Sequence, residues 1–289
     1  MAEKSKITWC DHSFSPWFGC SKISPGCRHC YAARWASRTN ICSWGPGSDR
    51  RRSSDDYWRQ PLKWNARAAA GESRGLVFGG HLCDVFDPVP QVAQWRRDFF
   101  WLIKQTPALT WLLLTKRPGA ARGFLRSLWG DAPWDNVWLG VTAETQATAD
   151  RRVPILLDTP AIRRFVSVEP MLTVVSLHRW LHVIHRPDLA GEPFRGWSLE
   201  LSFMERIMAD DYCLPEIDWV ICGGETGSQY RRMDPGWARV LRDQCGAAGV
   251  PFFFKQSSAA APGTGDVLEG RRHHAMPCLT ASACNYPPF

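Results

Sequence analysis

Short runs of apolar, strand-favouring residues recur along the chain, and most of them are separated by a stretch with helical periodicity. The strand-like runs fall at 6–9, 75–78, 109–114, 136–141, 161–168, 217–222 and 250–254, and the helix-like stretches at 31–38, 89–105, 119–129, 144–157 and 235–246. A regular alternation of strand and helix is typical of a mostly parallel sheet with right-handed crossovers.

The pattern therefore predicts an α/β protein built as a partial or complete (β/α) TIM-type barrel, with an open doubly wound sheet as the other arrangement of the same units. Two segments interrupt the alternation and are expected to be insertions. The first, at about 40–72, follows the first helix, and the second, at about 173–216, follows the fifth strand. We expect one barrel-like domain over 1–256 and an irregular C-terminal tail over 257–289, which is rich in Ala, Gly, Pro and Ser.

Polar or glycine residues follow nearly every predicted strand. In parallel β/α folds the carboxyl ends of the strands meet at one rim, where such folds hold their active sites. The sequence therefore predicts a site at that rim. The residues concerned are Asp84, Lys116, Arg117, Thr142, Glu144, Ser167, Glu169, Gly223, Gly224, Glu225 and Lys255.

Three cysteines stand close together soon after the first predicted strand. Cys20, Cys27 and Cys30 lie within eleven residues, in a stretch that also contains a Pro-Gly pair. A two-residue spacer lets Cys27 and Cys30 point at one centre, as in both zinc and iron-sulfur loops. These three thiols are therefore predicted to bind a metal.

The identity of that metal stays open between two alternatives. A zinc site would take a fourth ligand from the nearby His29, His12 or Cys10. Three cysteines without a second Cys-x-x-Cys pair favour instead a 4Fe-4S cluster with one iron left for an exogenous ligand.

A three-cysteine cluster loop after the first strand of a β/α barrel resembles the radical S-adenosylmethionine superfamily. The resemblance implies that S-adenosylmethionine binds the open iron, that the reduced cluster cleaves it to a 5'-deoxyadenosyl radical, and that an external electron donor supplies the electron. It places His29 near the adenine and Gly79 and Gly80 near the methionine amine, with Asp84 beside them. The spacing departs from the superfamily, since six residues rather than three separate the first two cysteines.

Over nearly its whole length the chain also resembles a bacteriophage-associated three-cysteine-motif family of unassigned function. The shared phrases are SPWFGC at 15–20, SPGC at 24–27, WRQPL at 58–62, LTKRP at 114–118, SVEPM at 167–171, GGE at 223–225 and FKQ at 254–256. This resemblance implies the fold and the site, and it gives no substrate.

Further residues near the predicted rim are candidates for cofactor binding or catalysis. Thr142, Glu144, Glu169, Gly223, Gly224 and Glu225 are predicted to contact the cofactor. For Glu144 and Glu169 the alternative is a structural network of ion pairs with Lys116, Arg117 and Lys255. Cys10, Cys83, Lys116 and Lys255 are the candidate catalytic groups, the two thiols as further metal ligands or hydrogen-atom donors.

Charge and composition narrow the class of protein. The 35 Lys and Arg against 28 Asp and Glu give a net charge of +7, which favours an anionic partner such as a nucleic acid or nucleotide. No apolar run approaches the length of a membrane span, the first residues are polar, and the eleven cysteines are an odd number, so we expect a cytoplasmic protein with reduced thiols.

Two hypotheses follow. The first is an iron-sulfur, radical S-adenosylmethionine enzyme whose substrate is a nucleic acid, a nucleotide or another unidentified compound. The second is a zinc-stabilised accessory protein of phage origin that binds nucleic acid, for which the +7 charge and the sixteen Trp residues speak. Oligomeric state has no signature in the sequence.

Overall fold

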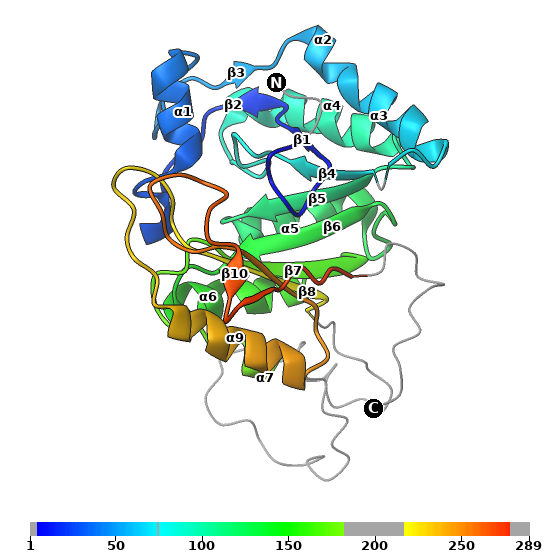
Figure 1. Ribbon diagram of the computed structural model, residues 1–289. Helices are drawn as coiled ribbons and strands as arrows, with labels where there is room; N and C mark the ends of the chain where they lie inside the picture. The colour runs from blue at the N-terminus through cyan, green and yellow to red at the C-terminus, as the bar shows by residue number, and fades with distance from the viewer. Residues whose placement is uncertain (1–4, 74, 182–216, 278–289) are drawn as a thin grey trace.

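The computed structural model describes residues 5–73, 75–181 and 217–277. Its main feature is a sheet of seven strands in which all neighbouring strands are parallel. In sheet order these are β1 (His12–Phe14), β4 (Leu76–Gly79), β5 (Thr110–Thr115), β6 (Val137–Thr142), β7 (Arg163–Val168), β8 (Trp219–Gly223) and β9 (Phe252–Gln256) (Figure 1).

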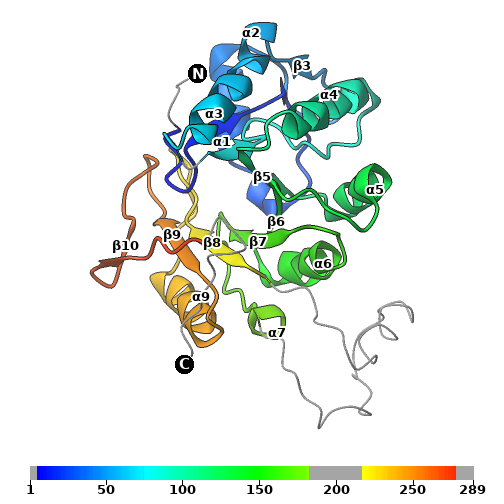
Figure 2. The same cartoon turned by 90° about the vertical axis from the view of Figure 1, so that its right-hand side faces the viewer.

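The sheet is curled, and helices cover its convex face (Figure 2). The order of the strands ends at β1 and β9, and within the described residues these two strands do not pair with each other. The sheet is thus a half barrel, and the prediction of an α/β protein with a partial β/α barrel is confirmed at this level.

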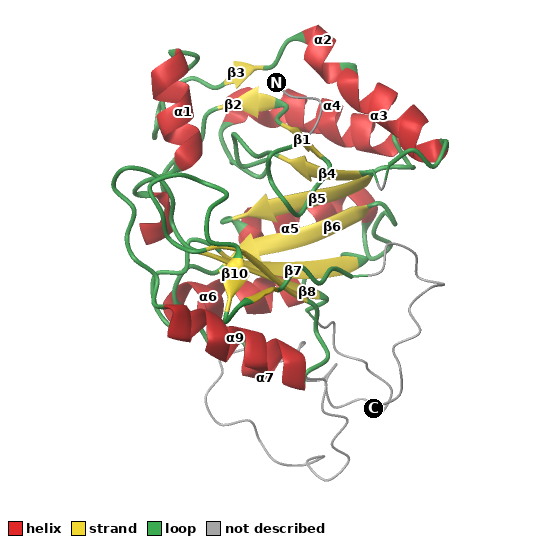
Figure 3. Ribbon diagram, viewed as in Figure 1, coloured by secondary structure: helices red, strands yellow, loops and turns green. Residues whose placement is uncertain are grey.

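Most of the helices lie where the periodicity predicts them (Figure 3). They are α1 (Tyr31–Thr39), α4 (Ala93–Lys104), α5 (Pro118–Trp129), α6 (Gln146–Leu157) and α9 (Pro235–Ala247), and η2 (Pro90–Val92) leads into α4. Local signals set several starts: Thr145 and Thr148 form a capping box before α6, and the Asp234 side chain accepts a hydrogen bond from the Gly236 amide at the start of α9.

The two faces of the sheet form two hydrophobic cores, because side chains alternate along each strand. The convex face packs against the helices through residues such as Trp111, Leu139 and Val166. The concave face is filled by a separate, largely aromatic cluster. Its buried members are Trp9, Cys10, Leu76, Phe78, Leu112, Trp138, Phe165, Trp219, Ile221 and Phe253.

Gly140 shows why this aromatic layer depends on one small residue. It stands at a concave-face position of β6, and a Cβ there would come within 2.4 Å of the Phe165 ring. The absence of a side chain at Gly140 lets the neighbouring aromatic ring fill the space.

The first strand lies later than predicted. Residues 6–9 form a turn, and the strand begins at His12. Trp9 is buried not as a strand residue but because its ring packs on the concave face, with its centroid 4.6 Å from Phe78 and 6.1 Å from Trp219. The strand expectation at 6–9 is therefore wrong, since the apolar residues there serve tertiary packing.

The first expected insertion, at about 40–72, contains a short strand and two helices. β3 (Arg51–Arg52) pairs antiparallel with β2 (Trp17–Phe18), and α2 (Asp55–Trp58) and α3 (Gln60–Ala69) follow. Of the second, at about 173–216, the structure describes residues 173–181 with α7 (His178–Leu181), and the remainder lies outside the described residues.

The segment after β9, expected to be irregular, contains a two-stranded hairpin of β10 (Val267–Leu268) and β11 (Arg271–Arg272). Beyond it, the Phe254 amide donates to the His273 carbonyl at 2.7 Å, so this segment covers the edge of β9. Residues 278–289 of the expected tail lie outside the described residues. Among the helices that the structure describes, none has the length and apolar character to cross a membrane.

Candidate functional site

The concave face changes from aromatic to polar toward the carboxyl ends of the strands. On β7 the inward residue Phe165 is followed two positions later by Ser167, and on β9 Phe253 is followed by Lys255. Thr142 takes the same place on β6. The strand alternation thus builds an apolar floor beneath a polar chamber at the rim of the half barrel.

A cavity occupies this chamber, and it is lined by fifteen of the nineteen residues predicted at the rim, in the cysteine loop or as cofactor-binding or catalytic candidates. They come from the cysteine loop and from the ends of β4 to β9, and they share one opening because parallel strands end at the same edge. The predicted residues in the lining are Cys20, Cys27, His29, Cys30, Gly80, Cys83, Asp84, Lys116, Arg117, Thr142, Ser167, Glu169, Gly224, Glu225 and Lys255.

The other four predicted residues lie outside the lining of this cavity. Cys10 is buried in the aromatic core of the concave face, where burial raises its pKa to about 11. Gly79 and Gly223 are packed against neighbouring side chains of Leu113 and Glu169. The fourth, Glu144, is fully buried and contacts the cysteine loop from below.

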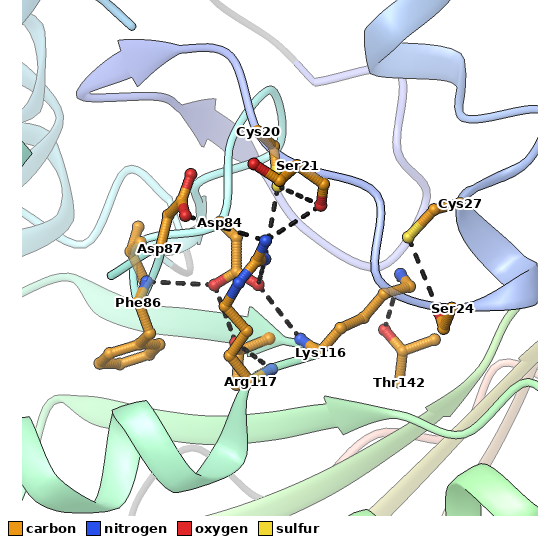
Figure 4. Close-up of polar contacts among 12 residues, drawn as sticks. Cys20, Ser21, Ser24, Cys27, Asp84, Phe86, Asp87, Lys116, Arg117 and Thr142 are labelled. Carbon is orange, nitrogen blue, oxygen red and sulfur yellow. Dashed lines mark hydrogen bonds and ion pairs between the residues drawn. The ribbon is translucent and has the colours of Figure 1, made fainter. Parts of the chain in front are cut away.

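The cysteine loop, residues 20–30, is held at its start by the end of β5. Arg117 places one guanidinium nitrogen 3.5 Å from the Cys20 sulfur and 2.8 Å from an Asp84 carboxylate oxygen, and its other nitrogen donates to the Ser21 carbonyl at 3.0 Å (Figure 4). The same Asp84 carboxylate accepts from the Thr115 hydroxyl at 2.8 Å. The Phe86 and Lys116 amides also donate to this carboxylate, so protein donors already occupy both of its oxygens.

The middle of the loop is held by the end of β6. The Glu144 carboxylate accepts hydrogen bonds from the Ser24 hydroxyl and from the Gly26 amide, the latter at 3.3 Å. Its second oxygen pairs with the buried Arg152 at 2.6 Å. Gly26 is needed for this approach, because a Cβ there would come within 2.9 Å of the carboxylate.

The end of the loop is held by the segment after β8. Glu225 pairs with the His29 ring at 3.1 Å and with Arg231, whose guanidinium also donates to the Pro25 carbonyl at 3.1 Å. Burial raises the pKa of the Glu225 carboxyl, but hydrogen bonds from Arg231 and His29 outweigh it and lower the pKa to about 2. From α1, Arg34 donates to the Thr226 carbonyl at 2.5 Å.

The thiols of the loop lie in unlike electrostatic surroundings. Burial and Asp84 raise the pKa of Cys20 to about 12, despite the contact with Arg117. At Cys27 burial also raises the pKa, but Lys116 and hydrogen bonds from Ser24 outweigh it, so the pKa is lowered. The surroundings of Cys27 therefore favour its thiolate, whereas those of Cys20 favour the thiol.

Other polar groups of the chamber pair with each other as well. Lys255 and Glu169 form an ion pair at 2.5 Å, and Lys116 donates to the Thr142 hydroxyl at 3.3 Å. In the described residues, no group of three or more His, Cys, Asp or Glu side chains is close enough to hold a metal ion.

Sequence reasoning missed four lining residues that carry chemistry. Trp9, Tyr31, Trp44 and His81 contribute rings to the cavity wall. The Tyr31 hydroxyl donates to the His81 carbonyl at 2.5 Å, and burial lowers the pKa of the His81 ring to about 4. Only the position of Tyr31, directly after Cys30, gave a signal in the sequence.

The fold and this rim define a class, namely half-barrel α/β proteins with a cysteine loop above a polar chamber. The chain belongs to a family described as proteins of unknown function (DUF5131), whose model matches residues 4–277. Comparison with curated proteins found no match, and comparison with solved structures found none either.

Proposed function

We propose that this protein is an iron-sulfur enzyme that binds a 4Fe-4S cluster through Cys20, Cys27 and Cys30 and uses S-adenosylmethionine. The observation that carries the proposal is that the three thiols, all from one loop, line a single cavity at the rim of a parallel half barrel. Structural zinc sites are closed by their ligands, whereas these thiols adjoin a chamber with room for a further ligand.

The residue types of the loop suit a cluster, although the three thiols, as the described residues place them, are not close enough together to hold a single metal ion. Three thiols from one loop are the ligands that iron-sulfur clusters take. The guanidinium of Arg117 contacts Cys20, and the charge of Lys116 lowers the pKa of Cys27, so cations adjoin the negative charge that thiolates and cluster would bring.

The chamber also fits an organic ligand. The rings of Trp9, Tyr31, Trp44 and His81 line it and offer surfaces on which an aromatic group of a ligand can pack. Gly80 lines the same chamber with a positive φ of 88°, which allows the backbone to approach a ligand closely.

When bound, the cluster supplies one-electron reductive cleavage of S-adenosylmethionine, with 5'-deoxyadenosine as the product and an external donor as the source of the electron. The role of the protein is to hold the cysteine loop in place and to shield the chamber. Glu144, Arg117 and Glu225, which follow three different strands, hold the loop. The aromatic floor beneath Lys255 and Thr142 shields the chamber.

The test is anaerobic reconstitution of the full chain with iron and sulfide, followed by addition of S-adenosylmethionine and dithionite. We expect reductant-dependent 5'-deoxyadenosine that is lost in Cys30→Ser and retained in Cys42→Ser, a matched change of a half-buried thiol outside the cavity lining. A well-loaded cluster that yields no 5'-deoxyadenosine would refute the use of S-adenosylmethionine.

The second candidate function is a zinc-stabilised accessory protein that binds nucleic acid. The observation in its favour is the net charge of +7 together with basic segments around the cysteine loop. A colourless protein with one zinc per chain would support it. A role in bacteriophage biology and a cytoplasmic location are proposals that rest on the resemblance and on the reduced thiols expected from the sequence.

A further inference from the structure

Most of the net positive charge of the chain comes from one segment, which also contributes residues to the cavity. Residues 17–52 contain seven Lys and Arg and one Asp, so this segment carries +6 of the net +7. The segment comprises the cysteine loop, α1 and the connection to β3. Figure 1 shows α1 on the side toward which the arrowheads of β5 and β6 point, which is the side of the rim.

Three of the seven cations in this segment pair with a carboxylate or hold another part of the backbone. Arg50 pairs with the buried Asp87, Arg52 with Asp55, and Arg34 donates to a backbone carbonyl. The other four cations are exposed and, within the described residues, have no ion pair with a carboxylate, although two of them, Lys22 and Arg51, donate to backbone carbonyls at 3.3 Å. The four cations are Lys22, Arg28, Arg38 and Arg51.

The same segment contributes two aromatic rings to the wall of the chamber. Tyr31, at the start of α1, lines the cavity and is 48% exposed. Trp44 lines the same cavity and packs against the small cluster around Phe18. Exposed cations next to accessible rings are the surface that single-stranded nucleic acids use, since phosphates pair with the cations and bases stack on the rings.

We infer that the substrate is a single-stranded nucleic acid, with its backbone along Lys22, Arg28, Arg38 and Arg51 and one base stacked on Trp44 at the entrance to the chamber. This inference rests on the proposed function for what happens in the chamber, but the binding surface itself needs no cluster. Because phosphates carry the affinity and stacking on a ring is tolerant of sequence, binding is salt-dependent and has little sequence preference.

The test measures fluorescence anisotropy of labelled oligothymidylate DNA and oligouridylate RNA with the full, unloaded chain. We expect a Kd of about 10⁻⁴ to 10⁻⁶ M at physiological salt. Arg38→Glu with Arg51→Glu should weaken binding at least about tenfold and lower the salt slope by about 1.4, at about 0.7 per lost phosphate contact. Preference between the two oligonucleotides assigns DNA or RNA.

The matched control is Lys63→Glu with Lys104→Glu, two exposed cations on α3 and α4 whose replacement gives the same net charge. This control should bind like wild type, and Trp44→Leu should bind more weakly with an unchanged salt slope. Absent binding, or equal weakening in both charge variants, would overturn the inference. The same preparation is also reconstituted with the cluster and assayed for 5'-deoxyadenosine in the absence of oligonucleotide. Loss of oligonucleotide binding and loss of S-adenosylmethionine cleavage are therefore separate results.

Discussion

The contact between Ser24 and Glu144 gives the sharpest test of how the cysteine loop is held. Ser24→Ala removes one hydrogen bond to a fully buried carboxylate. A hydrogen bond to a charged group contributes about 1.5–3 kcal/mol. Because Glu144 keeps the Gly26 amide and Arg152 as partners, we expect the lower part of that range.

Glu144→Gln acts on the same contact from the other side, at a higher cost. The glutamine keeps the shape of the side chain but leaves the Arg152 guanidinium, 2% exposed, without its counter-charge. Breaking a buried ion pair in this way costs about 3–5 kcal/mol. The free energy of unfolding should therefore fall further than in Ser24→Ala.

The assay is urea unfolding of the unloaded chain, followed by tryptophan fluorescence, for wild type, both single variants and the double variant. If Ser24 and Glu144 act through one contact, the double variant loses less than the two single losses combined, by at least about 0.5 kcal/mol. Ser127→Ala, at an exposed hydroxyl that donates to the Phe124 carbonyl, is the control and should change stability by at most about 0.5 kcal/mol. Additive losses, or a Ser24 variant no different from the control, would refute the reasoning.

Three further predictions concern the aromatic floor of the chamber, the ion pair of Glu225 with Arg231, and the pKa of Cys27. Gly140→Ala forces a methyl group into the ring packed against it and should lower the free energy of unfolding by about 1–3 kcal/mol in the same urea assay. Glu225 has a pKa of about 2 against about 4.3 when unfolded, so its stabilisation is complete above pH 4.3 and is lost as the pH falls toward 2. Glu225→Gln should flatten that part of the profile of unfolding midpoint against pH, and an unchanged profile would show that the pair with Arg231 contributes nothing. Lys116→Met should raise the pKa of Cys27, because the charge of Lys116 lowers it. The measurement is alkylation of the Cys27-containing peptide of the unloaded chain, followed by mass spectrometry as a function of pH. If the pH of half-maximal alkylation does not change, Lys116 is not the cause of the lowered pKa.

Much of the fold could be predicted from the sequence because local patterns and tertiary structure agree. The helix at 235–246 has an N-cap at Asp234 and Pro at its first position, and the structure extends it by only one residue. The stretch at 6–9 shows the limit of such patterns. The apolar Trp9 packs against the concave face of the sheet and does not belong to a strand. A short apolar run does not reveal which of these two roles it has.

The location of the candidate site could be predicted from the sequence, but the contacts that its residues make could not. Polar residues after each strand correctly indicated the rim, because parallel strands end together. Asp84, Glu144 and Glu225 hold the cysteine loop through hydrogen bonds and ion pairs, and these contacts depend on distances across the fold. Spacing in the sequence carries no such distances, and the partner Arg152 lies in the middle of a helix with nothing to mark it.

The identity of the metal tests the central claim most directly. The full chain is purified without oxygen, and iron, acid-labile sulfide and zinc are measured for wild type and for Cys27→Ser. The proposed function predicts a brown protein with about four iron and four sulfide per chain, both lost in the variant. A colourless wild-type protein that carries one zinc and no iron would contradict it.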